Sequence, residues 1–184
     1  MSAGRFIAVV GPSGVGKDSV MAGLVAARPG LMLARRVITR AADLGGEEFD
    51  PVTEAQFIQS RDRGEFVLHW GAHGLFYGIP IAVLAELASG QDLLANLSRG
   101  VLAEAQGKFA QLTVLQLTAS PEVLAQRLAE RGRETETQIA ARLGRSLDPL
   151  PAGLDLQSVS NDGPLADTVA SALTALYPDS GPVK

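Results

Sequence analysis

A stretch near the start of the chain carries the residue types that bind phosphate. It reads Gly11-Pro12-Ser13-Gly14-Val15-Gly16-Lys17-Asp18-Ser19. The Gly-x4-Gly-Lys spacing lets backbone amides surround phosphate oxygens at a helix N-terminus, where unpaired N–H groups and the helix dipole favour negative charge. Lys17 can reach the outer phosphates as a compact cation. The stretch therefore predicts a P-loop in which residues 11–19 hold a nucleotide.

The two residues after Lys17 depart from the usual pattern. A hydroxyl residue normally follows the lysine, whereas here Asp18 stands there and Ser19 comes next. We expect the Ser19 hydroxyl to bind Mg²⁺, directly or through water. For Asp18 two interpretations stay open. It orients the water shell of Mg²⁺, or it is an acidic residue that the helix dipole favours in a first turn.

The elements that must position this loop alternate along the chain. The pattern predicts main strands over 6–10, 31–38, 93–97, 112–117 and 156–160, a hairpin of 66–70 with 75–78, and helices over 17–28, 53–64, 80–88, 99–106, 120–133, 135–147 and 164–176. A turn-rich loop covers 41–51, and a loose tail begins at Tyr177. This alternation predicts one α/β domain with a parallel sheet and helices on both faces. Its core comprises 1–33 and 89–184, with a small lobe inserted at about 34–88.

Several polar residues follow directly after predicted strands. Ligands bind at the carboxyl ends of strands in open α/β sheets, so these positions should face one crevice. They are Gly11, Thr39-Arg40, Asn96-Leu97-Ser98, Thr118 and Asn161.

Composition limits the function classes. The chain has 184 residues, 46% of them hydrophobic, which is enough for a sizeable core. A net charge of −4 argues against nonspecific nucleic-acid binding, and the absence of cysteine excludes disulfide and thiolate sites. No apolar run reaches the roughly 18 residues that a membrane span needs, and the start lacks a signal-peptide layout. We expect a cytoplasmic protein with a small-molecule substrate.

The order of motifs resembles that of guanylate kinases over nearly the whole chain. The matching segments are Gly11–Lys17, Thr39-Arg40, Tyr77-Gly78, Arg131-Gly132-Arg133, Ile139-x-x-Arg142-Leu143 and Asn161-Asp162. The resemblance implies a P-loop kinase with a substrate lobe and an arginine-bearing lid at about 131–147. Non-catalytic relatives of these kinases tend to lose the loop lysine and the lid arginines, both of which are present here.

The departures from guanylate kinases concern base recognition. Where that family has a guanine-reading glutamate and a hydroxyl residue, this chain has Leu68 and Ile79. Leaving the guanine protons unpaired would cost on the order of 1–3 kcal/mol each. The segments Gly16–Ser19, Val37–Arg40, Gly45–Glu47, His69–Ile79, Asn96–Arg99 and Leu128–Glu134 are similar to those of ribose 1,5-bisphosphate phosphokinases. This resemblance implies ATP-dependent formation of 5-phosphoribosyl 1-diphosphate in phosphonate breakdown; a guanylate-type nucleoside monophosphate kinase is the alternative.

Site roles follow from the P-loop and the resemblance. Lys17, Arg131 and Arg142 are the predicted catalytic residues, because phosphoryl transfer needs cations at the transition state. Arg133 and Asn161 are expected beside the nucleotide, and Arg145 lies on the same helix face as Arg142. The expected substrate-binding residues are Arg40, His69, His73, Tyr77, Asn96, Ser98 and Arg99.

Several of these residues keep a structural alternative. The arginines could form a solvated basic face, and the two histidines could be hydrogen-bonded lobe residues. Ser98 could cap a helix, and Asn161 could serve a turn.

Overall fold

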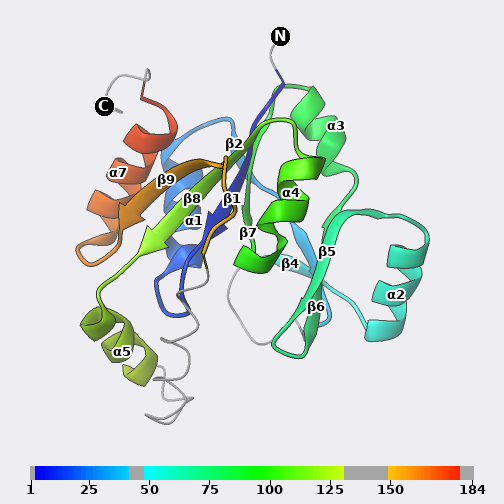
Figure 1. Cartoon of the computed structure of the whole chain (residues 1–184), viewed down its shortest axis with the longest axis horizontal. Helices are drawn as coiled ribbons and strands as arrows, with labels where there is room; N and C mark the ends of the chain where they lie inside the picture. Colours follow the sequence, from blue (N-terminus) through cyan, green and yellow to red (C-terminus); the bar gives the residue numbers. More distant parts are fainter. Residues whose placement is uncertain (1–2, 42–47, 131–148, 179–184) are drawn as a thin grey trace.

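The first of two sheets carries the P-loop. The computed structural model describes residues 3–41, 48–130 and 149–178 (Figure 1). Five parallel strands lie in the order β2-β7-β1-β8-β9. Their bounds are β1 Phe6–Val10, β2 Leu31–Leu33, β7 Asp92–Asn96, β8 Leu112–Thr118 and β9 Asp155–Ser160. The predicted α/β architecture with a parallel sheet is confirmed.

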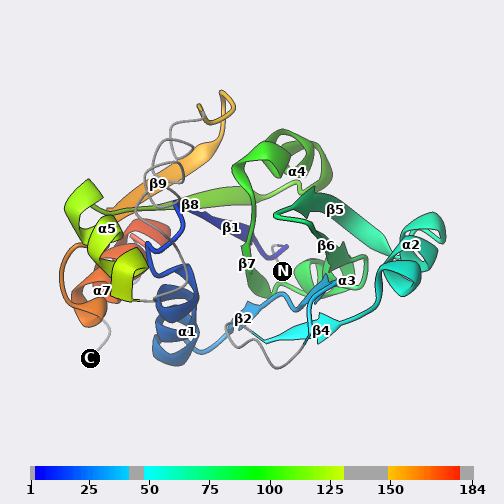
Figure 2. The same ribbon diagram turned by 90° about the horizontal axis from the view of Figure 1, so that it is seen from below.

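Helices cover both faces of this sheet because its central strand is apolar on both sides. Ile7 and Val9 of β1 face a core with α1 (Lys17–Ala27) and α7 (Leu165–Leu176). Phe6 and Ala8 face a second core that includes α4 (Leu102–Lys108). Figure 2 shows α1 and α7 on one side of the sheet and α4 on the other. A fully buried strand of this kind is what a parallel sheet requires.

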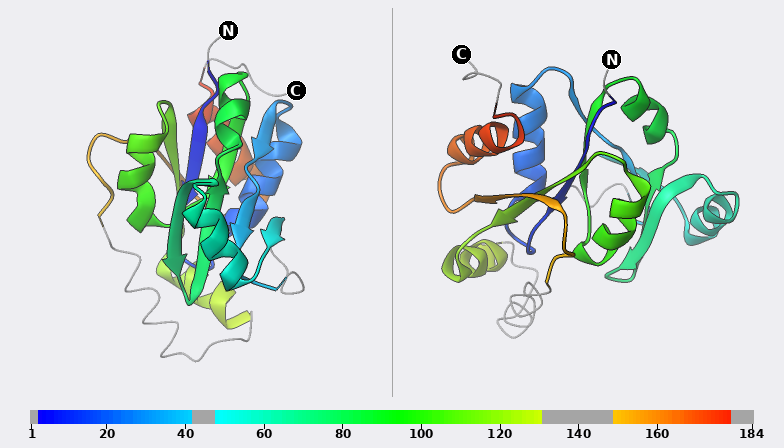
Figure 3. Two further views of the ribbon diagram at one scale, coloured as in Figure 1. Left: turned by 90° about the vertical axis from the view of Figure 1, so that its right-hand side faces the viewer. Right: turned by 45° about the horizontal axis from the view of Figure 1, so that its top comes forward.

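The second sheet lies beside the second core. Its strands follow the order β4-β3-β6-β5, with β4 Phe49–Pro51, β3 Arg36–Ile38, β6 Leu75–Pro80 and β5 Phe66–Ala72. Helix α2 (Glu54–Asp62) lies on the outer side of this sheet (Figure 3). A capping box starts this helix: the Thr53 hydroxyl accepts from the Gln56 amide at 3.2 Å, and the Gln56 side chain accepts from the Thr53 amide at 2.8 Å.

A bulge decides which side chains of β5 face the core. The register shifts between Phe66 and Leu68. Two residues that would share a face in a regular strand therefore point to opposite faces. Phe66 stacks on Phe57 of α2 at 4.8 Å between ring centroids. Leu68 and Trp70 face the opposite way, into the core shared with the first sheet.

Several predicted element boundaries are wrong. The expected strand 31–38 is two strands in different sheets, because the chain turns away from the first sheet after β2. Residues 49–51, expected in a loop, form β4 by pairing in parallel with β3. Helix α3 begins at Val83 rather than at Pro80, which ends β6.

The region around Ser98 also differs. Ser98 makes no side-chain capping bond, and a 3₁₀ turn (Arg99–Val101) precedes α4. Ser120 does cap α5 (Pro121–Glu130): its hydroxyl accepts from the Val123 amide at 3.4 Å. The helix predicted over 135–147 lies outside the described residues. None of the helices in the described ranges combines the length and apolarity that crossing a membrane requires.

Candidate active site

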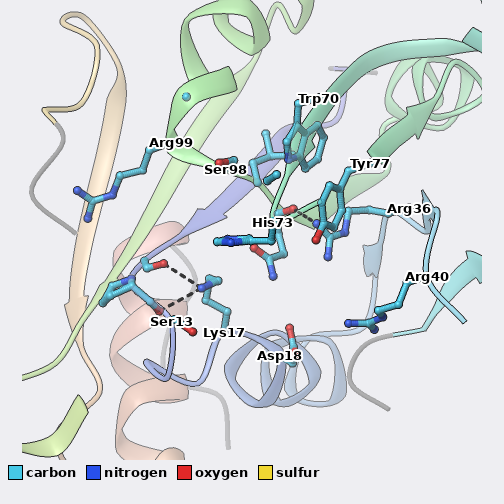
Figure 4. Close-up of a pocket in the computed structure, with 16 residues that line it drawn as sticks. Ser13, Lys17, Asp18, Arg36, Arg40, Trp70, His73, Tyr77, Ser98 and Arg99 are labelled. Carbon is cyan, nitrogen blue, oxygen red and sulfur yellow. Dashed lines mark hydrogen bonds between the residues drawn. The ribbon is translucent and has the colours of Figure 1, made fainter. Parts of the chain in front are cut away.

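A cavity of about 410 Å³ opens between the P-loop and the second sheet (Figure 4). Residues from five segments line it: Gly11, Pro12, Ser13, Lys17 and Asp18; Arg36 and Arg40; Trp70, Ala72, His73 and Tyr77; Asn96, Leu97 and Ser98; and Arg99 with Gly100. Four of these side chains are cationic. Of the described residues that line the cavity, Asp18 is the single carboxylate. The cavity therefore suits an anionic ligand.

The P-loop has the backbone that its glycines permit. Gly14 and Gly16 have φ of 86° and 91°, in the left-handed region that disfavours side chains. Helix α1 starts at Lys17, so the N-terminal end of the helix, where amides have no partner within the helix itself, lies at the loop. The Lys17 ammonium donates to the carbonyl oxygens of Gly11 and Pro12 at 2.9 and 3.2 Å. These bonds hold the cation over the loop, where it can meet a phosphate.

A second cavity of about 400 Å³ lies on the other side of the loop. It is lined by Gly14, Gly16, Ser19, Arg127, Glu130, Asn161, Gly163 and Leu165. Ser19, expected at Mg²⁺, thus faces this cavity, whereas Asp18 faces the first one. Thr118 lines neither cavity. The predicted single crevice is therefore divided by the P-loop into two spaces.

Asn161 braces the P-loop rather than reaching freely into the second cavity. It is 5% exposed, and its Nδ2 donates to the Val15 carbonyl oxygen at 2.7 Å. Its Oδ1 accepts from the Thr168 hydroxyl at 2.7 Å. Arg127, which the sequence analysis did not single out, donates to the main-chain oxygens of Asn161 and Val15 at 2.8 and 3.4 Å. Both polar atoms of the Asn161 carboxamide are thus used inside the protein.

Asp162, the next residue, joins two loops beside this brace. Its carboxylate accepts from the Ser120 amide at 2.6 Å and from the Ser160 hydroxyl at 2.7 Å. Hydrogen bonding to the Ser120 amide, followed by that to Ser160, lowers the pKa of Asp162. The carboxylate therefore stays charged and keeps the start of α5 next to the end of β9.

Six predicted substrate-binding residues do meet at the first cavity. Arg40, His73, Tyr77, Asn96, Ser98 and Arg99 all line it. His73 reaches it from the hairpin turn, where its φ of 54° and that of Gly74, 73°, give the left-handed backbone of a tight two-residue turn. Thr39 ties the same hairpin to β3, because its hydroxyl accepts from the Phe76 amide at 2.8 Å.

The structure does not bring His69 into the cavity. His69 is exposed on β5 and lies near Phe66, at 6.5 Å between ring centroids. Its neighbour Trp70 lines the cavity. Successive side chains of a strand point to opposite faces, so His69 and Trp70 cannot share one. The predicted role of His69 in substrate binding is therefore corrected.

Leu68 and Ile79 lie beneath the cavity and do not form its wall. They are paired across β5 and β6, and both are fully buried in the core shared with the first sheet. By the resemblance to guanylate kinases they stand at base-reading positions, yet neither lines the cavity. Both side chains are instead packed among apolar residues.

Arg36 and Trp70 line the cavity but were not among the predicted site residues. Arg36 is 7% exposed, and Trp70 stacks on Tyr77 with 5.3 Å between ring centroids and 10° between planes. Burial lowers the pKa of Arg36 to about 10, which leaves it cationic at neutral pH. A signal existed in the sequence: Arg36 lies two residues from the apolar Ile38, on the same face of a predicted strand.

The remaining predicted residues cannot be placed. Arg131, Arg133, Arg142 and Arg145 lie outside the described residues, so their roles stay predictions. Among the described residues no cluster of three or more acidic or histidine side chains could hold a metal alone. Mg²⁺ is commonly bound by one or two oxygen ligands and substrate phosphates, and Asp18 beside the loop fits that donor set.

The chain is similar to curated enzymes over almost its whole length. It is 52% identical over 172 residues to ribose 1,5-bisphosphate phosphokinase PhnN of Ruegeria sp. (strain TM1040), covering 92% of this chain and 90% of that protein. It is 42% identical to the enzyme of that name from Agrobacterium fabrum, covering 95% and 97%. It also matches 29% of a bifunctional ribose 1,5-bisphosphokinase-thymidine phosphorylase of Cupriavidus necator, at 44% identity. No family model matches.

Solved structures agree on the fold. The crystal structure of guanylate kinase from Anaplasma phagocytophilum has a TM-score of 0.67 at 18% identity and covers 98% of this chain and 88% of that one. A gluconokinase from Sinorhizobium meliloti 1021 has a TM-score of 0.55 at 20% identity, with 97% and 94% covered. The fold is that of guanylate-kinase-like P-loop enzymes, and by sequence the chain belongs to the ribose 1,5-bisphosphate phosphokinase family.

Proposed function

We propose that this protein transfers the γ-phosphoryl group of ATP to the 1-phosphate of ribose 1,5-bisphosphate. The products are 5-phosphoribosyl 1-diphosphate and ADP, and the setting is phosphonate breakdown in the cytoplasm. Family membership supports the reaction. The observation that carries it is a cationic cavity on the P-loop whose base-reading positions, Leu68 and Ile79, are buried in the core.

The donor side of the reaction belongs to the P-loop. Its amides and Lys17 bind the β- and γ-phosphates, while the Asn161 brace keeps the Val15 carbonyl turned away from them. Mg²⁺, when bound, would supply charge neutralisation for these phosphates. Asp18 would hold it from the first cavity, directly or through water, and Ser19, which lines the second cavity, is the alternative ligand.

The acceptor side belongs to the residues across the cavity. Arg40 and Tyr77 bind the reacting 1-phosphate, with His73, Asn96, Ser98 and Arg99 around the sugar. One oxygen of that phosphate forms a bond to the γ-phosphorus of ATP. The bond from this phosphorus to the β,γ-bridging oxygen breaks, and its electron pair leaves with ADP. Arg131 and Arg142 are proposed to stabilise the charge of the transition state.

ADP release in a coupled assay tests the proposal. Purified protein with Mg-ATP should release ADP faster with ribose 1,5-bisphosphate than with GMP, and ³¹P NMR should show a new diphosphate on the sugar. Faster turnover of GMP would instead support a guanylate-type kinase. The variant Lys17→Met serves as the background control for contaminating kinases.

A further inference from the structure

Arg36 is a buried cation in the wall of the first cavity, and no role has been given to it so far. It lies on β3 with 7% of its surface exposed, yet it lines the cavity. Arginine is rarely buried unless its charge is compensated, because removal of the guanidinium from water is costly. Asp18, which lines the same cavity, offsets part of this charge, and an anion bound in the cavity would offset it further.

The guanidinium of Arg36 is held in one place. Its Nη1 donates to the main-chain oxygen of Asn96 at 2.9 Å. Its central carbon lies 5.1 Å from the centroid of the Tyr77 ring and 6.0 Å from that of Trp70, and these two rings stack on each other. The cation is therefore preorganised between the end of β7 and an aromatic wall, which limits the entropy lost when it binds a ligand.

Arg36 lies on the lobe side of the cavity, where the charges of Asp18 and Arg40 both act on it. Figure 4 shows it beside Tyr77, whereas Lys17 and Ser13 lie together on the P-loop side. Arg40 is a separate arginine on the lobe side of the same cavity. Lys17 is needed for the phosphates of ATP, and one arginine suffices for the reacting phosphate. Arg99, a third arginine of the cavity, is placed around the sugar, so Arg36 is the cation left to match a second, non-reacting phosphate on the acceptor.

We infer that Arg36 binds the non-reacting phosphate of a bisphosphorylated sugar and so selects bisphosphates over monophosphates. This inference rests on the proposed function and assigns the 5-phosphate to Arg36. Arginine suits the task because its planar fork can bind a phosphate through two parallel hydrogen bonds. Arg36 is then a specificity residue of the acceptor site.

Calorimetric titration without ATP tests this separately from turnover. The ligands are ribose 1,5-bisphosphate and ribose 1-phosphate, which differ only in the 5-phosphate. The wild type should bind the bisphosphate more tightly by about tenfold to a hundredfold, the worth of charge-assisted hydrogen bonds. Arg36→Met should lose that difference while its affinity for ribose 1-phosphate stays the same.

Arg35 provides a matched control from the same strand region. Its side chain is 57% exposed and pairs with Asp50 at 2.7 Å, outside the cavity. Arg35→Met should leave both affinities unchanged. Arg36→Lys keeps a charge without the fork and should retain part of the difference; it also serves if Arg36→Met does not fold.

The outcomes separate the two proposals. Equal wild-type affinities for the two ligands would overturn the role of Arg36, as would an Arg36 variant that weakens both ligands alike or neither. A wild type that discriminates between the ligands through Arg36 but releases no ADP with ribose 1,5-bisphosphate would overturn only the proposed reaction.

Discussion

Replacement of Asn161 by alanine should lower both the stability of the fold and the affinity for ATP, because its carboxamide links the P-loop to α7. The change removes the bond to the Val15 carbonyl at 2.7 Å and the bond from the Thr168 hydroxyl at 2.7 Å. Both partners keep weaker contacts: Arg127 Nη1 lies 3.4 Å from the Val15 oxygen, and Thr168 Oγ1 lies 3.4 Å from the Ser160 oxygen. The Val15 carbonyl and the Thr168 hydroxyl therefore each keep one long hydrogen bond after the substitution.

The magnitude follows from these contacts. A buried group left without its partner costs about 1–3 kcal/mol, so the two together should lower the free energy of unfolding by about 2–3 kcal/mol. For a chain of this size that corresponds to a fall in melting temperature of about 4–12 °C. Because the Val15 carbonyl would then be held only by Arg127 at 3.4 Å, the loop amides lose alignment, and kcat/KM for ATP should fall by about tenfold.

Two measurements check this prediction, with Thr168→Val as the control. Thermal unfolding followed by circular dichroism gives the stability, and ADP release at varied ATP gives the kinetics. Thr168→Val removes one hydroxyl but keeps the bond from Asn161 to Val15, so it should lose stability without raising KM for ATP. An Asn161→Ala protein with wild-type melting temperature and wild-type KM for ATP would refute the proposal that Asn161 supports the P-loop.

Three further predictions follow from the described contacts. Lys17→Met should lower kcat by about a hundredfold or more while the circular dichroism spectrum and melting temperature stay close to wild type; retained ADP release would contradict its role. Leu68→Glu should not create a GMP site but should destabilise the fold by about 3–5 kcal/mol in urea unfolding, because the residue is fully buried; wild-type stability would contradict this. Burial, with the hydrogen bond to Asp92, raises the pKa of Tyr177 to about 12, so the protonated form stabilises the fold below pH 10 and this contribution is lost between pH 10 and 12. Between pH 10 and 12 the melting temperature of Tyr177→Phe should fall less steeply with pH than that of the wild type. Equal slopes for the two proteins would contradict this role of Tyr177.

Tyr177 also shows how far local sequence misleads at a chain end. It was expected to begin a loose tail, yet it is half-buried and two guanidinium groups lie over its ring. The central carbon of Arg28 lies 3.4 Å from its ring centroid and that of Arg5 lies 4.5 Å from it. Arg28 directly follows α1 and Arg5 directly precedes β1, so no local pattern around Tyr177 could have revealed these partners.

The residue pattern of the strands explains which features of the second sheet could be predicted and which could not. The hairpin was predicted because two β-rich runs flank a turn, and β5 and β6 confirm it. Period-2 alternation could also have separated His69 from Trp70. The bulge near Phe66 and the short strand β4 could not be read from the sequence, because each depends on a partner strand that is set by register.

The sequence by itself determined the P-loop, the order of the main strands and helices and the capping of α2. These features depend on residues within a few positions of one another, through backbone conformation, glycine and local hydrogen bonds. Only the tertiary structure decided that Arg36 and Trp70 line the cavity, that Leu68 is buried beneath it and that Asn161 braces the loop. Each of these depends on packing between segments far apart in the chain, where burial and charge are set by neighbours that the local sequence does not contain.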